Sequence, residues 1–199
     1  MKPTHAFCLF DTALGRCAIG WSAAGVFRVL LPSPDESVTR NTMRDSFTLI
    51  EEVKPPKFIV LAIQRIVALF EGGKDDLRTI DLDMTGVPPF HRAVYALARE
   101  IPPGETRTYG DLAKGLGDIA LSRAVGVALG ANPFPIVVPC HRIVGANGKM
   151  TGFSAPGGVE TKMRMLTIER ARLSNQPTLF DNDSAFVLAR GPRGKSKGA

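Results

Sequence analysis

Long apolar runs are missing from this chain of 199 residues, although 44% of its residues are hydrophobic. No run reaches the roughly 20 residues that a membrane-spanning helix needs. The apolar stretch from Phe7 to Phe10 ends at Asp11, so it is too short for the core of a signal peptide. We therefore expect no membrane partner and a soluble, cytoplasmic protein.

Cysteine is also scarce, since the chain holds only Cys8, Cys17 and Cys140. Three scattered cysteines cannot build a disulfide framework, and reduced thiols in a reducing compartment fit best. Cys8, Cys17 and His5 match no zinc-ligand spacing, so we place both N-terminal cysteines in the core and expect no metal and no cofactor. The formal charge of +6 suggests a polyanionic partner, although a solvated surface explains it equally well.

The first half of the chain predicts a small α+β layer. Short apolar segments separated by turn-forming residues favour an antiparallel meander, with strands at 7–10, 16–22 and 25–31. A polar helix is expected from Pro34-Asp35 to about Arg44, and a longer one from Phe58 to Phe70, stopped by two glycines. The segment from Thr79 to Pro89 is predicted as a strand followed by a linker.

The second half begins with helical patterns. Phe90, Val94, Leu97 and Ile101 recur at helical spacing before two prolines. A second helix starts at Thr108, with Asp111 at the capping-box position, and a third runs from about Ser122 to Leu129 after a glycine-containing break. This arrangement suggests a helix-turn-helix, and an ordinary helical hairpin fits the spacing equally well.

The third helix is unusual in its small residues: Ala124, Gly126, Ala128 and Gly130. Glycine at position 126 costs about 1 kcal/mol of helix stability relative to alanine. Small side chains permit a close approach, either of a nucleic-acid groove, with Arg123 available to phosphates or the base stack, or of a neighbouring helix.

The segment Pro139-Cys140-His141-Arg142 carries the candidate chemistry. It follows the apolar run Ile136 to Val138, which is predicted as a buried strand. A thiol becomes a strong nucleophile as thiolate, and a nearby imidazole can take its proton directly or through water. Neighbours on a regular strand point to opposite sides, so this pair requires a bridging water or a bent backbone. By itself the pair also fits a structural cysteine beside a surface histidine.

Taken in order, four motifs resemble the O6-alkylguanine-DNA alkyltransferases. They are Thr108-Tyr109-Gly110-Asp111-Leu112-Ala113, Ser122-Arg123-Ala124-Val125-Gly126, Ala131-Asn132-Pro133 and Pro139-Cys140-His141-Arg142. The resemblance covers about residues 90–169, and the N-terminal part shares only length and coarse pattern. It implies an α+β fold with a small ribonuclease H-like N-terminal domain (1–86) and a mainly helical, winged-helix-like C-terminal domain (87–173) containing the helix-turn-helix. A polar, disordered tail (174–199) is expected beyond them.

The resemblance also implies the reaction. Cys140 would take the alkyl group irreversibly from O6-alkylguanine, or from O4-alkylthymine, in double-stranded DNA after the base is flipped out. His141 would deprotonate the thiol through water and Glu169 would orient the imidazole. Tyr109 would donate a proton to the departing base, and Asn132 would brace the turn that carries the cysteine.

The same resemblance assigns the DNA contacts and the substrate pocket. The second helix of the motif would enter the minor groove, Arg123 would fill the vacated stack, and Tyr109 would help rotate the nucleotide. Further contacts are implied for Thr108, Ser122, Ala124, Gly126 and Val127, and the pocket residues are Pro135, Val144, Phe153 and Ser154. Two departures bear on specificity. Phe153 lies where the family usually has tyrosine, in a loop two residues longer, and Val127 replaces a residue that is often smaller.

The tail carries Gln176-Pro177-Thr178-Leu179-Phe180, which resembles peptides that dock on bacterial sliding clamps. We treat clamp binding through Gln176, Leu179 and Phe180 as a hypothesis, and we expect a monomer that associates with the nucleoid in a bacterium. Two other functions remain open: a lesion-sensing or regulatory DNA-binding protein with an inert Cys140, and a cysteine hydrolase. The hydrolase ranks last because no oxyanion-hole pattern accompanies the Cys-His pair.

Overall fold

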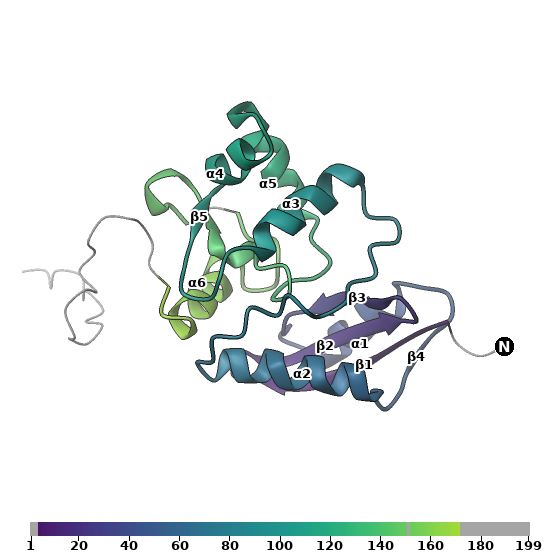
Figure 1. Cartoon of the computed structure of the whole chain (residues 1–199). Helices are drawn as coiled ribbons and strands as arrows, with labels where there is room; N and C mark the ends of the chain where they lie inside the picture. The colour runs from purple at the N-terminus through teal and green to yellow at the C-terminus, as the bar shows by residue number, and fades with distance from the viewer. Residues whose placement is uncertain (1–3, 151, 172–199) are drawn as a thin grey trace, which may run out of the picture.

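The computed structural model describes residues 4–150 and 152–171, which form a four-stranded sheet followed by a group of helices (Figure 1). The first three strands, β1 (His5–Thr12), β2 (Gly15–Ser22) and β3 (Gly25–Leu30), form the predicted antiparallel meander. A short strand that the sequence analysis missed, β4 (Ile50–Glu52), pairs in parallel with β1, so the sheet order is β3-β2-β1-β4. Strand β3 is therefore one edge of the sheet.

The two predicted helices cover opposite faces of this sheet. Helix α1 (Glu36–Arg44) is capped by Asp35, whose side chain accepts the Ser37 N–H at 2.8 Å, and it buries Met43 against one face. Helix α2 (Lys57–Phe70) lies across the other face and buries Ile59 and Ile66. The sheet is thus hydrophobic on both sides.

The strand predicted within residues 79–89 is wrong. Only an isolated bridge joins Leu82 to Val26, through hydrogen bonds of 2.9 Å (Val26 N–H to Asp81 carbonyl) and 2.8 Å (Asp83 N–H to Val26 carbonyl). The Asp83 carboxylate then accepts the Thr85 N–H at 3.0 Å. This side-chain contact turns the backbone away from the sheet edge, so the ladder does not extend.

The helical half contains the predicted helices close to their expected bounds. They are α3 (Pro89–Arg99), α4 (Tyr109–Gly115) and α5 (Ser122–Gly130), and a further helix, α6 (Gly158–Ile168), follows them. Thr108 caps α4 in a full capping box with Asp111, as predicted, and a 3-10 turn, η1 (Ile119–Leu121), links α4 to α5. Strands β5 (Arg107–Thr108) and β6 (Ile143–Val144) pair in parallel, and η3 (Ala146–Gly148) follows them.

The apolar run before the cysteine is buried, but it is not a strand. Ile136, Val137 and Val138 expose at most 1% of their surface, yet they form a turn in which Ile136 has φ of 78°. The Val138 N–H donates to the Phe134 carbonyl at 2.8 Å, which closes the turn. Burial explains the apolar composition, and periodicity alone does not distinguish a buried turn from a strand.

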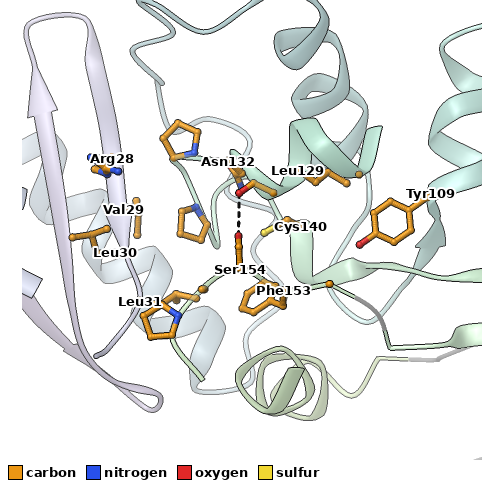
Figure 2. A pocket seen from close by; sticks show the side chains of 17 residues that line it. Arg28, Val29, Leu30, Leu31, Tyr109, Leu129, Asn132, Cys140, Phe153 and Ser154 are labelled. Atoms are coloured by element: carbon orange, nitrogen blue, oxygen red, sulfur yellow. Dashed lines mark hydrogen bonds between the residues drawn. The ribbon is translucent and has the colours of Figure 1, made fainter. Parts of the chain in front are cut away.

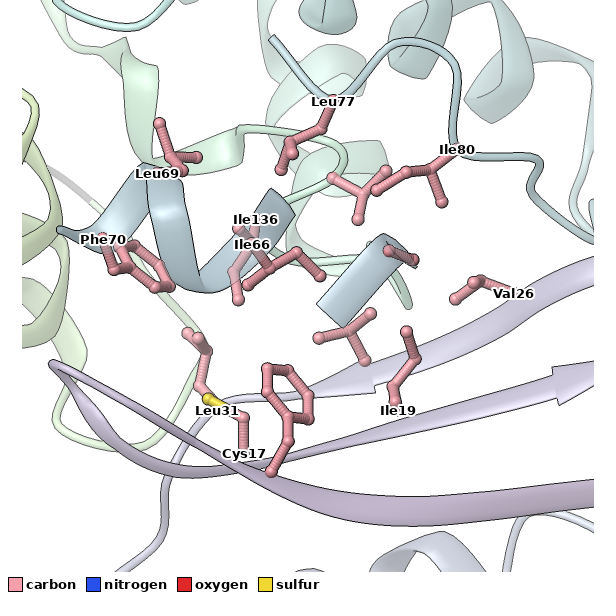
Figure 3. Close-up of a cluster of buried hydrophobic side chains, with 14 of the residues drawn as sticks. Cys17, Ile19, Val26, Leu31, Ile66, Leu69, Phe70, Leu77, Ile80 and Ile136 are labelled. Carbon is pink, nitrogen blue, oxygen red and sulfur yellow. The ribbon is translucent and has the colours of Figure 1, made fainter. Parts of the chain in front are cut away.

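The sheet and the helical half share one hydrophobic core. Ile136, Val137 and Met165 pack in the same cluster as α2 and the sheet, and Figure 3 shows Ile136 beside Ile66 and Leu69. At the sheet edge, the Val29 N–H of β3 donates to the Pro133 carbonyl at 2.9 Å. Within the part of the chain that the structure describes, no helix is long and apolar enough to cross a membrane.

Candidate active site

Cys140 begins a 3-10 turn, η2 (Cys140–Arg142), which follows the buried turn at residues 136–138 and supplies the bent backbone. Asn132 braces the preceding turn, because its side-chain amide donates to the Val138 carbonyl at 3.0 Å and its oxygen accepts the Phe134 N–H at 2.9 Å. The Cys140 thiol is partly buried and free of any disulfide. Burial raises its pKa, while a hydrogen bond from Asn132 and the charge of Lys162 act in the opposite direction.

His141, Arg142 and Glu169 form a buried network behind the cysteine. The Glu169 carboxylate lies 2.9 Å from Nε2 of His141, and it accepts hydrogen bonds of 2.9 and 2.8 Å from the Arg142 guanidinium. Arg142 also donates to the Ile101 carbonyl at 2.7 Å. Burial alone would raise the pKa of Glu169, but His141 and Arg142 outweigh it and lower that pKa to about 2.

The network fixes the tautomer of His141. Burial lowers the pKa of this imidazole more than Glu169 raises it, so the ring is neutral at pH 7. An ionised Glu169 can only accept hydrogen bonds, so the proton lies on Nε2 and Nδ1 carries the lone pair. Nδ1 is buried and has no hydrogen-bond partner among residues 4–150 and 152–171. It is therefore the ring nitrogen that can accept a proton.

Lys162 is a buried residue of this site that the sequence analysis missed. Its side chain is fully buried on α6, and its ammonium donates to the carbonyl of Ile143, just after η2. Burial lowers its pKa to about 8, and the neighbouring Cys140 opposes that shift. The sequence did contain a signal, because Lys162 shares the buried face of α6 with Met165 and Leu166, three and four residues later.

A pocket of about 550 Å³ opens in front of the thiol (Figure 2). It brings together six residues that the sequence analysis assigned to catalysis or substrate binding: Tyr109, Asn132, Pro135, Cys140, Phe153 and Ser154. Val144 is not among the lining residues, because it is only 2% exposed in β6, where it pairs with Thr108. Arg28 to Leu31 also line the pocket. No local sequence pattern predicted that β3 lines the pocket, since this strand lies more than a hundred residues before the cysteine.

The extended glycine-rich loop forms one wall of the pocket. Phe153 packs against the shared core, and the Ser154 hydroxyl donates to the Gly130 carbonyl at 3.0 Å, drawn as the dashed line in Figure 2. Gly152 and Gly157 have φ of 49° and 78°, which glycine adopts without strain. The loop is thereby attached to the C-terminal end of α5.

Helix α5 has a buried face and an open face. Val125, Ala128 and Leu129 are buried, whereas the open face follows helical spacing along Arg123, Gly126, Val127 and Gly130. A Cβ atom at position 126 would meet only the Tyr109 ring at an ordinary 3.9 Å, and one at position 130 would meet nothing within 4 Å. Packing inside the described chain therefore explains the small size of Ala128 but not that of the two glycines.

The remaining predicted contact residues lie at the start of α4 and α5. The Thr108 hydroxyl accepts the Asp111 N–H at 3.0 Å, and the Ser122 hydroxyl donates to the Ile119 carbonyl at 2.5 Å. Ala124 is partly exposed. Both hydroxyls thus stabilise the helix starts. Cys8 and Cys17 lie in the core, as predicted, and no group of three metal-ligating side chains occurs within residues 4–150 and 152–171.

Comparisons with known proteins agree with this arrangement. Residues 89–171 match the family model described as 6-O-methylguanine DNA methyltransferase, DNA binding domain. A methylated-DNA–protein-cysteine methyltransferase of Mycolicibacterium paratuberculosis is 42% identical over 126 residues, which cover 63% of this chain and 74% of that protein. A Mycobacterium tuberculosis OGT structure in complex with DNA has a TM-score of 0.67 at 29% identity, covering 83% of this chain and 92% of that one. The structure of the O6-methylguanine-DNA methyltransferase of Pyrococcus kodakaraensis has a TM-score of 0.63 at 27% identity, and the match covers 83% of this chain and 98% of that one.

Proposed function

Because this chain belongs to the methylated-DNA–protein-cysteine methyltransferase family, it repairs DNA by direct alkyl transfer, and we propose that Cys140 is the residue that accepts the alkyl group. The observation that carries this assignment is the placement of the Cys140 thiol in a pocket, backed by the buried His141–Glu169 pair. A neutral imidazole held by a carboxylate is the arrangement that activates a thiol.

The proposed step is a single displacement. The thiol proton moves through a water molecule to Nδ1 of His141, and the Cys140 sulfur attacks the alkyl carbon. A carbon–sulfur bond forms while the bond between that carbon and O6 of guanine breaks. The departing base takes a proton from the Tyr109 hydroxyl, which lines the same pocket, and the phenolate regains a proton through water from the His141 imidazolium, so the step is balanced. Water does not readily cleave the thioether product, so each protein molecule reacts once.

The substrate base must leave the helix before it can enter the pocket, since O6 is inaccessible to a thiol while the base is stacked. We propose that the open face of α5 enters the minor groove and that Arg123 fills the vacated stack. The two glycines of this face, at positions 126 and 130, support this because nothing inside the described chain requires them. O4-alkylthymine presents a similar alkyl carbon and is included in the proposed substrate range.

We also propose a finer description of the fold. The sheet order β3-β2-β1-β4 with a parallel β4 supports a ribonuclease H-like layer over residues 1–86, and the helices with β5 and β6 support a winged-helix-like unit over residues 87–173. The tail (174–199), including Gln176, Leu179 and Phe180, lies outside the described residues, so clamp binding stays a prediction. We expect the protein to act as a monomer on chromosomal DNA.

Intact-mass spectrometry tests the assignment. The protein is incubated with a duplex that contains one O6-methylguanine, beside the Cys140→Ser variant. We expect a stoichiometric gain of one methyl group, mapped to the Cys140 peptide and absent from the variant. Binding of the duplex without any mass gain would instead support a lesion sensor, and repeated turnover of an ester substrate without DNA would support a hydrolase.

A further inference from the structure

Among the described residues that line the pocket, Arg28 is the only charged one. It extends from β3, the edge strand next to the Asn132 turn, and Figure 2 shows it on the opposite side of Cys140 from Tyr109. Its guanidinium donates to the Ser46 hydroxyl at 2.7 Å, and that hydroxyl donates to the Thr42 carbonyl at 3.1 Å. A neutral hydroxyl therefore holds the side chain in place.

Arg28 has no carboxylate partner in residues 4–150 and 152–171. The arginines of the neighbouring strand and helix differ, because Arg16, Arg40 and Arg44 all form ion pairs with acidic residues. A guanidinium offers a planar set of donors that matches the two oxygens of a carboxylate or phosphate. No carboxylate of the described residues neutralises the charge at this wall of the pocket, so the guanidinium can bind another anion.

The pocket is also larger than a methylated base requires. Cavities of roughly 300 to 1,000 Å³ hold drug-sized ligands, and this one has about 550 Å³. Most of its lining is apolar, with side chains from three separate segments: Leu31, Pro133, Pro135, Phe153 and Ala155. A bulky substituent on the reacting carbon therefore has room to extend toward β3.

We propose that Arg28 forms an anion subsite of this pocket, which binds an oxyanion of the substrate. The oxyanion is either a carboxylate at the far end of a bulky O6 substituent or a phosphate close to the flipped nucleotide. This inference rests on the proposed alkyl transfer to Cys140 and adds a substrate preference to it. The β3 strand then contributes to specificity as well as to the fold.

Three duplexes of one sequence test the carboxylate source. Their single modified guanine carries an O6-methyl, an O6-(4-carbamoylbenzyl) or an O6-(4-carboxybenzyl) group, of which the last two differ mainly in charge. For the unaltered protein we expect transfer of the carboxybenzyl group to be roughly tenfold faster than that of the carbamoylbenzyl group, as a charge-assisted hydrogen bond provides. Arg28→Met should reduce this ratio to about 1. Arg28→Lys should retain part of it, because the positive charge remains but the planar set of guanidinium donors is lost.

The phosphate source is tested by the salt dependence of binding to an unmodified duplex. If Arg28 contacts a phosphate, Arg28→Met lowers the slope of log affinity against log salt by about 1. Arg44→Met is the matched control, since it removes an exposed positive charge from α1 that does not line the pocket. Arg44→Met should leave both the rate ratio and the slope unchanged.

The outcomes separate cleanly. A change in the rate ratio assigns the subsite to the substituent, and a change in the slope alone assigns it to the DNA backbone. If thermal unfolding shows that Arg28→Met is folded and neither the rate ratio nor the salt slope changes, the proposal is overturned.

Should Arg28→Met not fold, the same two quantities are measured on Arg28→Lys and Arg28→Gln instead. If neither benzyl group reacts, the substituent source is excluded and the slope decides alone. Failure of alkyl transfer itself would appear separately, as absence of methyl gain on unaltered Cys140.

Discussion

At the scale of single residues, the site depends on how buried charges are distributed around one imidazole. Arg142 contacts both oxygens of Glu169, so its charge largely cancels that of the carboxylate. Burial, assisted by the positive charges of Arg142 and Lys162, then lowers the pKa of His141 and keeps the ring neutral. Without Arg142, an isolated carboxylate would favour the imidazolium, and a protonated ring cannot accept the thiol proton.

The same network predicts a specific response to acid. The folded state lowers the pKa of Glu169 from 4.5 to about 2, so this group stabilises the fold above pH 4.5, and the stabilisation is lost as pH falls toward 2. The integrated loss is about 3 kcal/mol in the free energy of unfolding. His141, whose pKa is also lowered, adds a loss that begins below its ordinary value of 6.5.

Urea unfolding between pH 8 and pH 3 measures this response. Glu169→Gln should be less stable at pH 7, by roughly 3 kcal/mol, because Arg142 stays buried without its counter-charge. Its stability should also depend less on pH below 4.5. If the free energy of unfolding depends on pH in the same way in the variant and the unaltered protein, Glu169 is not the group that causes the loss of stability in acid.

Lys162 leads to a prediction about thiol reactivity. Its positive charge lowers the pKa of Cys140, in opposition to burial. We expect Lys162→Gln to slow thiolate-dependent reaction of Cys140 with iodoacetamide at pH 7 by roughly tenfold. Glutamine can still donate to the Ile143 carbonyl, so the variant removes charge with little loss of hydrogen bonding. Lys162→Arg is the control that retains the charge. If Cys140 of Lys162→Gln reacts with iodoacetamide as fast as that of the unaltered protein, this electrostatic role is ruled out.

At the scale of elements, the proposed docking of the open face of α5 on DNA leads to a prediction about Val127. Val127 is 63% exposed there, so substitutions at this position should leave the fold intact. We expect Val127→Glu to weaken duplex binding by roughly tenfold, because a carboxylate would face the phosphates. Val38→Glu on α1 is the matched control, with the same charge change at a side chain that is 51% exposed. The affinity for the duplex is measured by fluorescence anisotropy. An equal loss of affinity in both variants would exclude α5 as the docking face.

Elements with local signals were predictable from the sequence, and those formed by distant contacts were not. The capping box at Thr108 and the glycines after α2 predicted those helices correctly. The turn at residues 136–138 was mistaken for a strand because burial requires apolar residues in either conformation. Strand β4 has only three residues and pairs through β1, so no local pattern revealed it. Likewise, Arg28 reaches the pocket only through the packing of β3 against Pro133.

At the scale of the whole molecule, the shared core makes the two halves interdependent. Ile136, Val137 and Met165 are buried against α2 and the sheet, and each such side chain contributes about 1.5 to 3 kcal/mol when fully buried. We expect a fragment of residues 87–173 to lose most of its stability and its methyl transfer. Circular dichroism and the mass assay measure both. A fragment that folds and reacts as fast as the full chain would show that the sheet contributes nothing to the site.

The contact between β3 and Pro133 has a consequence for the behaviour of the protein at high concentration. A sheet edge with unpaired N–H and C=O groups is a template for strand addition and aggregation. On the β3 side, the Val29 N–H is already bonded by the chain that shapes the pocket. The other edge, β4, is only three residues long and carries the exposed Glu51, whose charge repels a second copy, whereas Glu52 is ion-paired with Arg40 and Arg44. Any substitution that loosens the Pro133 turn should therefore reduce colloidal stability together with repair.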